Sequence, residues 1–381
     1  MSLAAERPRT APAEPDRLEG FSAPREVEHV FGHDAAIEEF EDALHSGRMH
    51  HAWLLVGPEG IGKATLAYRF ARTVLAHGEG GRPGDDHAVF RKVAALSHPN
   101  LLLLRRAYND KTKRHGQWIG VDEVRRLRAF LGNTAGESGW RVVIVDRADE
   151  LNTNAANALL KALEEPPSRT LFLLISGAEG RLPVTIRSRT RTLRLAALGE
   201  KDLENAVRAA LTRDGHKTET KTLETAIALS QGSVRRALEL VSGEGIELYD
   251  EIVATFASLP DLDGTQLHGL VERLASTSDT ERLELYLSLL LGLIERLIRF
   301  SATGEGATDQ ERTLAGRLVS PGNLAHWAEA WEAISLERAE AMALNLDRSL
   351  LVLDTWFRLQ GARTRTSCLA CHATALAETY G

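Results

Sequence analysis

A glycine-rich segment carries the most specific chemistry in this sequence. Residues 57–63 read Gly-Pro-Glu-Gly-Ile-Gly-Lys, which matches the phosphate-binding pattern G-x-x-x-x-G-K. The loop begins at Gly57, and the backbone N–H groups of Gly60 and Gly62 would line an anion nest at the start of a helix. Lys63 would reach the β and γ phosphates of a bound nucleotide. The pattern therefore predicts a site for ATP or ADP.

Two residues that a hydrolytic site needs are replaced. The position after Lys63 usually carries a Ser or Thr hydroxyl that holds Mg²⁺, and here it is Ala64. The apolar run that ends at Asp146 is typical of the strand on the metal side, but Arg147 stands where a catalytic Glu is usual. A guanidinium cannot polarise a water as a carboxylate would. We expect the site to bind nucleotide without firmly held Mg²⁺ and to hydrolyse it poorly or not at all.

Three nearby side chains leave alternatives open. Thr65 belongs to the same loop, but one step along a helix rotates a side chain by about 100°, so its hydroxyl is expected to face elsewhere. Asp146 could still hold a metal-bound water. Glu150 would become the catalytic carboxylate if the usual register were shifted, which leaves hydrolysis as an alternative.

A run of arginines offers a second chemistry. Arg187, Arg189 and Arg191 alternate, so in an extended segment they would share one face. One interpretation is a solvated basic edge. The other is that Arg189 is an arginine finger, which neutralises charge on the γ-phosphate of a neighbouring subunit. Further along, Arg235 opens a predicted helix, where it is either an ordinary charged first turn or a contact to the phosphates.

The elements that would position these residues form an α/β domain. Four short apolar runs are continuous rather than alternating, as in buried parallel strands. These runs are residues 52–56, 101–104, 142–145 and 171–175. Helical spacing follows at 63–76 and 154–165, and such alternation predicts a parallel sheet. Ligands of these sheets bind beyond the strand C-termini, where the glycine loop falls.

The chain as a whole suits several domains, because 381 residues exceed one compact core. The predicted parts are a disordered N-terminal tail at 1–25, the α/β domain at 26–198, a small helical domain at 199–243 and an all-helical domain at 244–381. The tail is predicted from its Pro and charge content, without the apolar segment of a secretory signal.

Composition narrows the class of protein. The net charge of −7 argues against a dedicated nucleic-acid coat, although local DNA contacts remain compatible with it. Two cysteines cannot form a disulfide framework, so we expect a cytoplasmic protein with no membrane contact. Cys368 and Cys371 precede His372 in the C-x-x-C-H pattern of haem attachment. We expect neither haem nor zinc, since an export signal and further metal ligands are missing.

Three segments resemble the bacterial clamp-loader subunits of the AAA+ superfamily. They are residues 50–63, residues 157–167 with the sequence Asn-Ala-Leu-Leu-Lys-Ala-Leu-Glu-Glu-Pro-Pro, and residues 182–189. Ser188-Arg189-Thr190 is similar to the finger motif Ser-Arg-Cys of that family. The resemblance extends over roughly 27–243, and it implies an AAA+ domain, a helical lid and a C-terminal collar.

Within that family, the chain resembles the delta-prime subunits of DNA polymerase III, whose ATPase parts decay while the finger persists. The resemblance implies a stator in a five-subunit loader, beside the ATPase subunits and delta, that places the sliding clamp on primed DNA. Arg189 would serve the neighbouring ATPase site and Arg235 would sense the nucleotide. Such a chain is part of a polymerase holoenzyme without being an active ATPase itself.

Other readings of the sequence stay open. An ATP-hydrolysing motor subunit of the tau or gamma type would require a hydroxyl at position 64 and a Glu after Asp146. A small-molecule kinase leaves the Asn-Ala-Leu-Leu-Lys segment unexplained. A scaffold that binds no nucleotide is the third alternative. Many relatives carry a four-cysteine zinc module, whereas residues 77–98 contain no cysteine.

Overall fold

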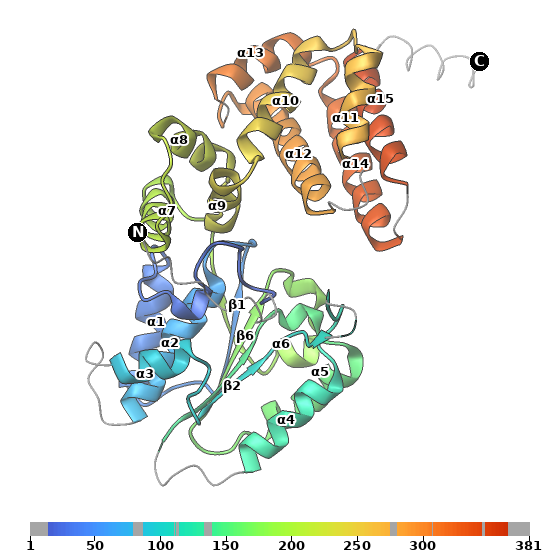
Figure 1. The fold of residues 1–381 in the computed structure, drawn as a ribbon. Coiled ribbons are helices and arrows are strands. Elements are labelled where there is room, and N and C mark those ends of the chain that lie inside the picture. Colours follow the sequence, from blue (N-terminus) through green and yellow to red (C-terminus); the bar gives the residue numbers. More distant parts are fainter. Residues whose placement is uncertain are drawn as a thin grey trace, which may run out of the picture. The chain divides into compact units, whose positions relative to one another are not determined.

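The computed structural model describes residues 14–78, 87–109, 111, 114–132, 139–274, 280–306, 308–344 and 347–364. The described residues form two compact units (Figure 1). The first unit lies within residues 1–223 and 230–239, and the second lies within residues 224–229 and 240–381.

The first unit is built on a five-stranded parallel sheet in the order β2-β5-β6-β1-β7. The strands are β1 (Ala52–Val56), β2 (Leu101–Leu104), β5 (Arg141–Val145), β6 (Thr170–Ser176) and β7 (Arg191–Arg194). Leu174 of β6 lies between Leu54 of β1 and Val145 of β5, so the chain leaves β1 and β5 at the same edge of the sheet. Every residue of β6 is buried, as expected for a central parallel strand.

Helices cover both faces of this sheet, as Figure 1 shows. On one face lie α1 (Asp34–His45), α2 (Lys63–Gly78) and α3 (His87–Ala94), and on the other lie α4 (Val121–Gly132), α5 (Thr153–Glu164) and α6 (Val184–Arg187). Successive strand residues feed opposite layers, because side chains alternate along a strand. Trp53 and Leu55 pack on the first face, and Leu54 and Val56 on the second. The predicted α/β class of fold is confirmed.

Residues 1–25 were predicted to be a disordered tail. The part of this segment that the structure describes, residues 14–25, is packed. The Phe21 side chain is 2% exposed and its ring stacks on His216 with centroids 4.5 Å apart. The backbone N–H of Ser22 donates to the Asp214 carboxylate at 3.1 Å. A composition rich in Pro and charge predicted disorder, but one aromatic side chain can bury enough apolar area to fix a short segment.

Shorter elements complete the first unit. They are the 3₁₀ turns η1 (Pro24–Glu26), η2 (Ala148–Glu150) and η3 (Glu179–Arg181), and the hairpin of β3 (Tyr108–Asn109) with β4 (Arg114–His115).

The segment predicted as a separate lid, residues 199–243, is helical but is divided between the two units. Its helices are α7 (Glu200–Asp214), α8 (Thr220–Leu229) and α9 (Val234–Ser242). Helix α7 belongs to the first unit, whereas residues 224–229 and the chain from 240 onward belong to the second. Burial explains the difference, because Ala226, Leu229 and Leu240 contribute to the apolar core of the second unit.

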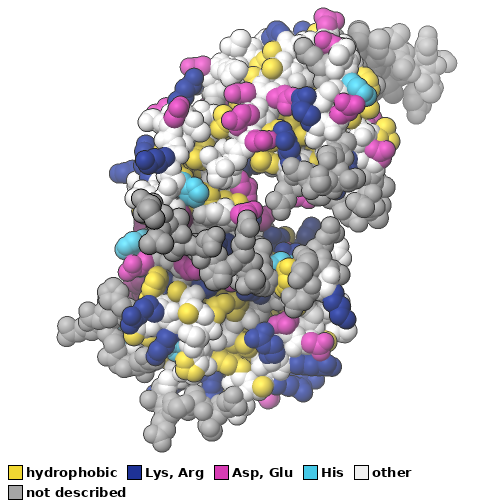
Figure 2. Space-filling view, viewed as in Figure 1, with side chains coloured by type: hydrophobic (Ala, Val, Ile, Leu, Met, Phe, Trp, Pro, Cys, Tyr) yellow, Lys and Arg dark blue, Asp and Glu magenta, His cyan; other side chains and the backbone are white. Residues whose placement is uncertain are grey.

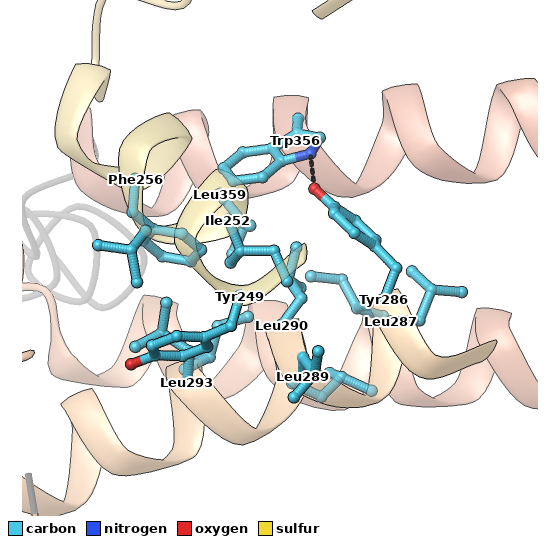
Figure 3. Packing of buried hydrophobic residues seen from close by; sticks show 14 of the residues in the cluster. Tyr249, Ile252, Phe256, Tyr286, Leu287, Leu289, Leu290, Leu293, Trp356 and Leu359 are labelled. Carbon is cyan, nitrogen blue, oxygen red and sulfur yellow. Dashed lines mark hydrogen bonds between the residues drawn. The ribbon is translucent and has the colours of Figure 1, made fainter. Parts of the chain in front are cut away.

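The second unit is helical, as predicted. Its main helices are α10 (Gly245–Ser258), α11 (Gly264–Leu274), α12 (Thr280–Thr303), α13 (Asp309–Leu318), α14 (Leu324–Leu344) and α15 (Arg348–Thr364). Figure 3 shows the aromatic centre of its core, where the Trp356 indole N–H donates to the Tyr286 hydroxyl at 3.1 Å. The Phe256 ring meets Trp356 edge to face at 5.2 Å. None of the described helices has the length and apolar character that crossing a membrane requires.

One buried carboxylate ties three helices of this unit together. Glu311 of α13 lies 2.7 Å from the Arg296 guanidinium of α12, and the side chains are 0% and 5% exposed. The Tyr249 hydroxyl of α10 donates to the same oxygen at 2.7 Å. The second oxygen accepts the backbone N–H of Thr308 at 2.9 Å, which caps α13. Outside this core, acidic and basic side chains are interspersed on the face that Figure 2 shows.

We predict that Glu311→Gln destabilises the second unit by about 3–5 kcal/mol, because it leaves the Arg296 guanidinium buried without its counter-charge. Urea denaturation followed by circular dichroism measures the change. Glu329→Gln is the matched control, since Glu329 is 73% exposed beside His326 and its loss should cost less than about 0.5 kcal/mol. Equal effects of the two substitutions would contradict a structural role for the buried pair.

Candidate nucleotide site

The glycine loop has the predicted setting, between β1 and the first residue of α2. Gly60 (φ 77°) and Gly62 (φ 98°) adopt left-handed backbone conformations that favour glycine. A Cβ atom on Gly60 would overlap Ser233 at the start of α9, whereas one on Gly62 would meet nothing within 4 Å. The loop is therefore closed on the α9 side and open beside Gly62, where a phosphate would lie.

The Lys63 side chain folds back onto the glycine loop. Its Nζ donates to the carbonyl oxygens of Gly57 at 2.8 Å and Pro58 at 2.5 Å. The residue is 8% exposed. Burial lowers the pKa of the Lys63 ammonium, and the nearby Glu59 carboxylate opposes that shift. The Lys63 ammonium is thus placed for an anion at the loop.

A cavity of about 580 Å³ opens beside this loop, a volume suited to a small ligand. Gly60, Gly62, Lys63 and Ala64 line its loop end. Apolar side chains line other parts of the wall, as a nucleotide base would need. They are Phe21, Val27, Val30, Leu198 and Leu238. Thr65 also lines the cavity, which the helical rotation argument did not predict.

Asp146 lies at the end of β5 and is 9% exposed. Burial raises the pKa of its carboxyl to about 7, and the neighbouring Asp16 adds to the shift while Arg147 and Arg105 oppose it. Asp16 comes from the packed N-terminal segment and pairs with Arg105 at 3.5 Å. Burial raises the pKa of Asp16 as well. The cavity therefore contains a second acidic group that the motif did not reveal.

Arg147, at the position of the usual catalytic Glu, is surrounded by carboxylates. Its Nε lies 2.7 Å from Glu150, its Nη1 lies 3.0 Å from Glu59, and its Nη2 lies 3.9 Å from Asp149. Burial opposes the charge on Arg147, but these carboxylates outweigh it and raise the pKa of the guanidinium. The position thus holds a permanent cation.

Glu150 is already occupied by cations, which disfavours it as a shifted catalytic base. One of its oxygens pairs with Arg147 and the other lies 3.0 Å from the Nε atom of Arg106. Burial raises the pKa of Glu150, and the two guanidinium groups oppose that rise. Because both of its oxygens face guanidinium groups, Glu150 is not positioned to orient an attacking water.

The predicted arginine face is not continuous. Residues 184–187 form α6, and the extended backbone begins only with Arg191 in β7, so Arg187 and Arg189 do not alternate along a strand. Arg189 donates from Nη1 to the Thr185 carbonyl at 2.8 Å and pairs through Nη2 with Glu164 of α5 at 2.9 Å. Its side chain is 35% exposed. Arg189 lies on the edge formed by α5 and α6.

Arg235 contacts the glycine loop through its backbone. Its backbone N–H donates to the Gly60 carbonyl at 3.2 Å, and its side chain lines the cavity. The guanidinium pairs with Glu239 at 2.9 Å and contacts the Asp16 carbonyl oxygen at 3.5 Å. The structure therefore brings together the glycine loop, Asp146 and Arg235.

Comparisons with known proteins find relatives of the part of the chain that contains this site. The sequence model described as "DNA polymerase III, delta subunit" matches residues 32–199. DNA polymerase III subunit delta' of Pseudomonas aeruginosa is 43% identical over 141 residues, which cover 36% of this chain and 41% of the relative. DNA polymerase III subunit gamma of Buchnera aphidicola subsp. Schizaphis graminum is 27% identical over 219 residues, covering 57% of this chain and 58% of the relative.

The chain is similar to these subunits of DNA polymerase III over part of its length. It spans 58% and 41% of the lengths of these two relatives. Among solved structures, a gamma subunit-related protein of DNA polymerase III from Thermotoga maritima is similar, with a TM-score of 0.38 and 17% identity. The alignment covers 86% of this chain and 99% of that protein.

Side chains that could bind a metal are sparse among the described residues. Within the described ranges, no group of three or more His, Cys, Asp or Glu side chains is arranged to hold a metal ion. Ala64 lines the cavity beside Lys63 and offers no oxygen ligand. We expected Cys368 and Cys371 to bind neither haem nor zinc. Both residues lie outside the described part of the chain.

We predict that Asp146→Asn stabilises the protein more at pH 8 than at pH 5. A carboxyl whose pKa rises from 3.8 unfolded to about 7 folded loses stability as pH increases between those values. The gain from the amide should therefore grow by about 2–3 kcal/mol between the two pH values, as urea denaturation would measure. The control Asp122→Asn, at an 85% exposed side chain, should show no such trend. Parallel stability curves for wild type and Asp146→Asn would refute the prediction.

Proposed function

We propose that the chain is a delta-prime-like stator of the DNA polymerase III clamp loader. It acts in the cytoplasm with the ATPase subunits and the delta subunit of a hetero-pentamer that places the sliding clamp on primed DNA. Its own site holds ATP or ADP and hydrolyses it poorly or not at all. It supplies Arg189 to the ATPase site of a neighbouring subunit.

The observation that carries this proposal is the pairing of Arg147 with carboxylates in place of a catalytic Glu. Loss of a general base typically costs about 10²–10⁴ in rate. Here the replacement is a cation, which Glu59 and Glu150 hold at 3.0 Å and 2.7 Å. Ala64 removes a second requirement, the hydroxyl ligand of Mg²⁺. A site with both changes supports binding without turnover.

The surroundings of Arg189 support a role outside the nucleotide cavity of this chain. Its guanidinium is partly exposed, and contacts with Glu164 and the Thr185 carbonyl fix its direction. A side chain that acts on another molecule must be both displayed and held in place, because ordering it on contact would cost entropy. A finger in this role contributes about 10³–10⁵ in rate to the neighbouring site.

We predict that Arg189→Ala leaves the folding and nucleotide binding of the isolated chain intact. It should lower ATP turnover of the reconstituted loader by roughly 10³-fold or more, because the γ-phosphate charge of the neighbour is no longer neutralised. Steady-state phosphate release measures this. Arg194→Ala is the control, since Arg194 is 72% exposed in a pair with Glu179. An unchanged rate of the assembly with Arg189→Ala would remove the finger role.

The motor of the tau or gamma type is the second candidate, because a gamma subunit is similar over 57% of the chain. A motor subunit would hydrolyse ATP without other subunits, whereas the proposed stator would not. We expect no ATP turnover from wild type or from Ala64→Ser, since a hydroxyl alone does not replace the missing carboxylate at Arg147. Brisk hydrolysis by the purified Ala64→Ser protein would favour the motor and would show that Arg147 does not prevent catalysis.

A further inference from the structure

This site lacks the hydroxyl ligand that holds Mg²⁺ in most phosphate-loop proteins, because the residue after Lys63 is Ala64. The side chain next to Lys63 on the cavity wall is the Ala64 methyl group, which cannot coordinate a metal. The charge that the ion would bring near the outer phosphates is therefore missing from the expected place. A cation of the chain itself lines the same cavity instead, the Arg147 guanidinium.

The fold brings Arg147 and Lys63 to the same edge of the sheet. Lys63 follows the loop after β1, and Arg147 follows β5, while β6 lies between these two strands. Both residues line the cavity into which the open side of Gly62 faces. Arg147 is near enough to Lys63 to contribute to lowering the pKa of its ammonium. Two cations thus flank the place where phosphates would lie.

The partners of Arg147 differ in how firmly they can hold it. Glu150 is 14% exposed, lies 2.7 Å from the guanidinium and is also bound to Arg106. Glu59 lies on the glycine loop, and its side chain is 71% exposed. Exposed ion pairs contribute little, whereas buried ones are costly to break. A phosphate can therefore take the place of Glu59 while Glu150 keeps Arg147 in position.

We propose that this cavity binds the polyphosphate of a nucleoside di- or triphosphate without a divalent cation, with Arg147 supplying the charge that Mg²⁺ supplies elsewhere. A guanidinium suits this task, because its planar donors pair with two phosphate oxygens at once. The inference rests on the nucleotide binding in the proposed function and extends it to the form of the ligand. Glu59 then competes with the phosphates for Arg147.

The competition gives the two members of the Glu59–Arg147 pair opposite effects. Arg147→Gln removes a charged donor to the phosphates and should weaken nucleotide binding by about tenfold or more. Glu59→Gln removes the competitor and should strengthen it. A pair that merely stabilised the loops would weaken binding whichever partner was lost.

Titration of the full chain with methylanthraniloyl-labelled ATP and ADP tests the proposal, in Mg²⁺ and in EDTA, with unlabelled nucleotide as competitor. We expect the affinity of the wild-type protein for nucleotide to change by less than about threefold between the Mg²⁺ and EDTA buffers. Arg106→Gln is the matched control, because Arg106 pairs with the same Glu150. It should leave affinity nearly unchanged, whereas Ala64→Ser with Arg147→Glu should make binding depend on Mg²⁺.

The outcomes separate this inference from the proposed function. Wild-type binding that disappears in EDTA, or weaker binding by Glu59→Gln, would overturn metal-free binding and leave the stator role standing. No binding in either buffer would remove nucleotide from the proposed function itself. Circular dichroism of each variant verifies folding, and Glu59→Gln changes only an exposed loop side chain, so at least one variant remains informative.

Discussion

The parallel pairing of β1 and β5 with the buried strand β6 determines where the functional residues of the first unit can lie. Each of these strands is apolar and enclosed by helices on both faces, so its backbone groups must pair with neighbouring strands. The register places Leu54 and Val145 on either side of Leu174. The chain then leaves β1 and β5 at one edge, and the glycine loop and Arg147 meet there although 88 residues separate Glu59 from Arg147.

Positive and negative side chains are paired at that edge. Lys63 and Arg147 provide positive charge, and Glu59, Asp149 and Glu150 lie around Arg147. Asp146 is nearly enclosed, and burial raises the pKa of its carboxyl to about 7, so near neutral pH it contributes only part of a negative charge. Glu59 is the most exposed of the carboxylates around Arg147, so it is the partner that an anion would displace most easily.

The sequence predicted the elements of this unit well for a physical reason. Continuous apolar runs identify buried parallel strands, and the observed β1 and β2 coincide with the predicted 52–56 and 101–104. The glycine loop was also predicted from the sequence, since its left-handed backbone conformations favour Gly. Contacts between segments far apart in the sequence could not be predicted from local patterns. The Glu59–Arg147 ion pair is the clearest case.

Two other differences show what local patterns miss. The N-terminal segment was predicted to be disordered from average composition, but the Phe21 ring stacks on His216, just after α7, and orders it. The alternation of Arg187 and Arg189 suggested a strand, whereas the chain turns through α6 at that point. In both cases a tertiary contact overrides the local preference, and the residues that decide it are far away in sequence.

The two arginines proposed to act on phosphates occupy separate settings. Arg147 follows β5 and is held by carboxylates around the cavity, while Arg189 lies on the edge of α5 and α6 and is held by Glu164 and a carbonyl. They share no partner, so changes at one should be nearly additive with changes at the other. Loss of the metal ligand at Ala64 and of the carboxylate at Arg147 therefore leaves the geometry of Arg189 unaltered. Under the proposed function, this independence would let the chain keep Arg189 for its neighbour while its own pocket does not hydrolyse nucleotide.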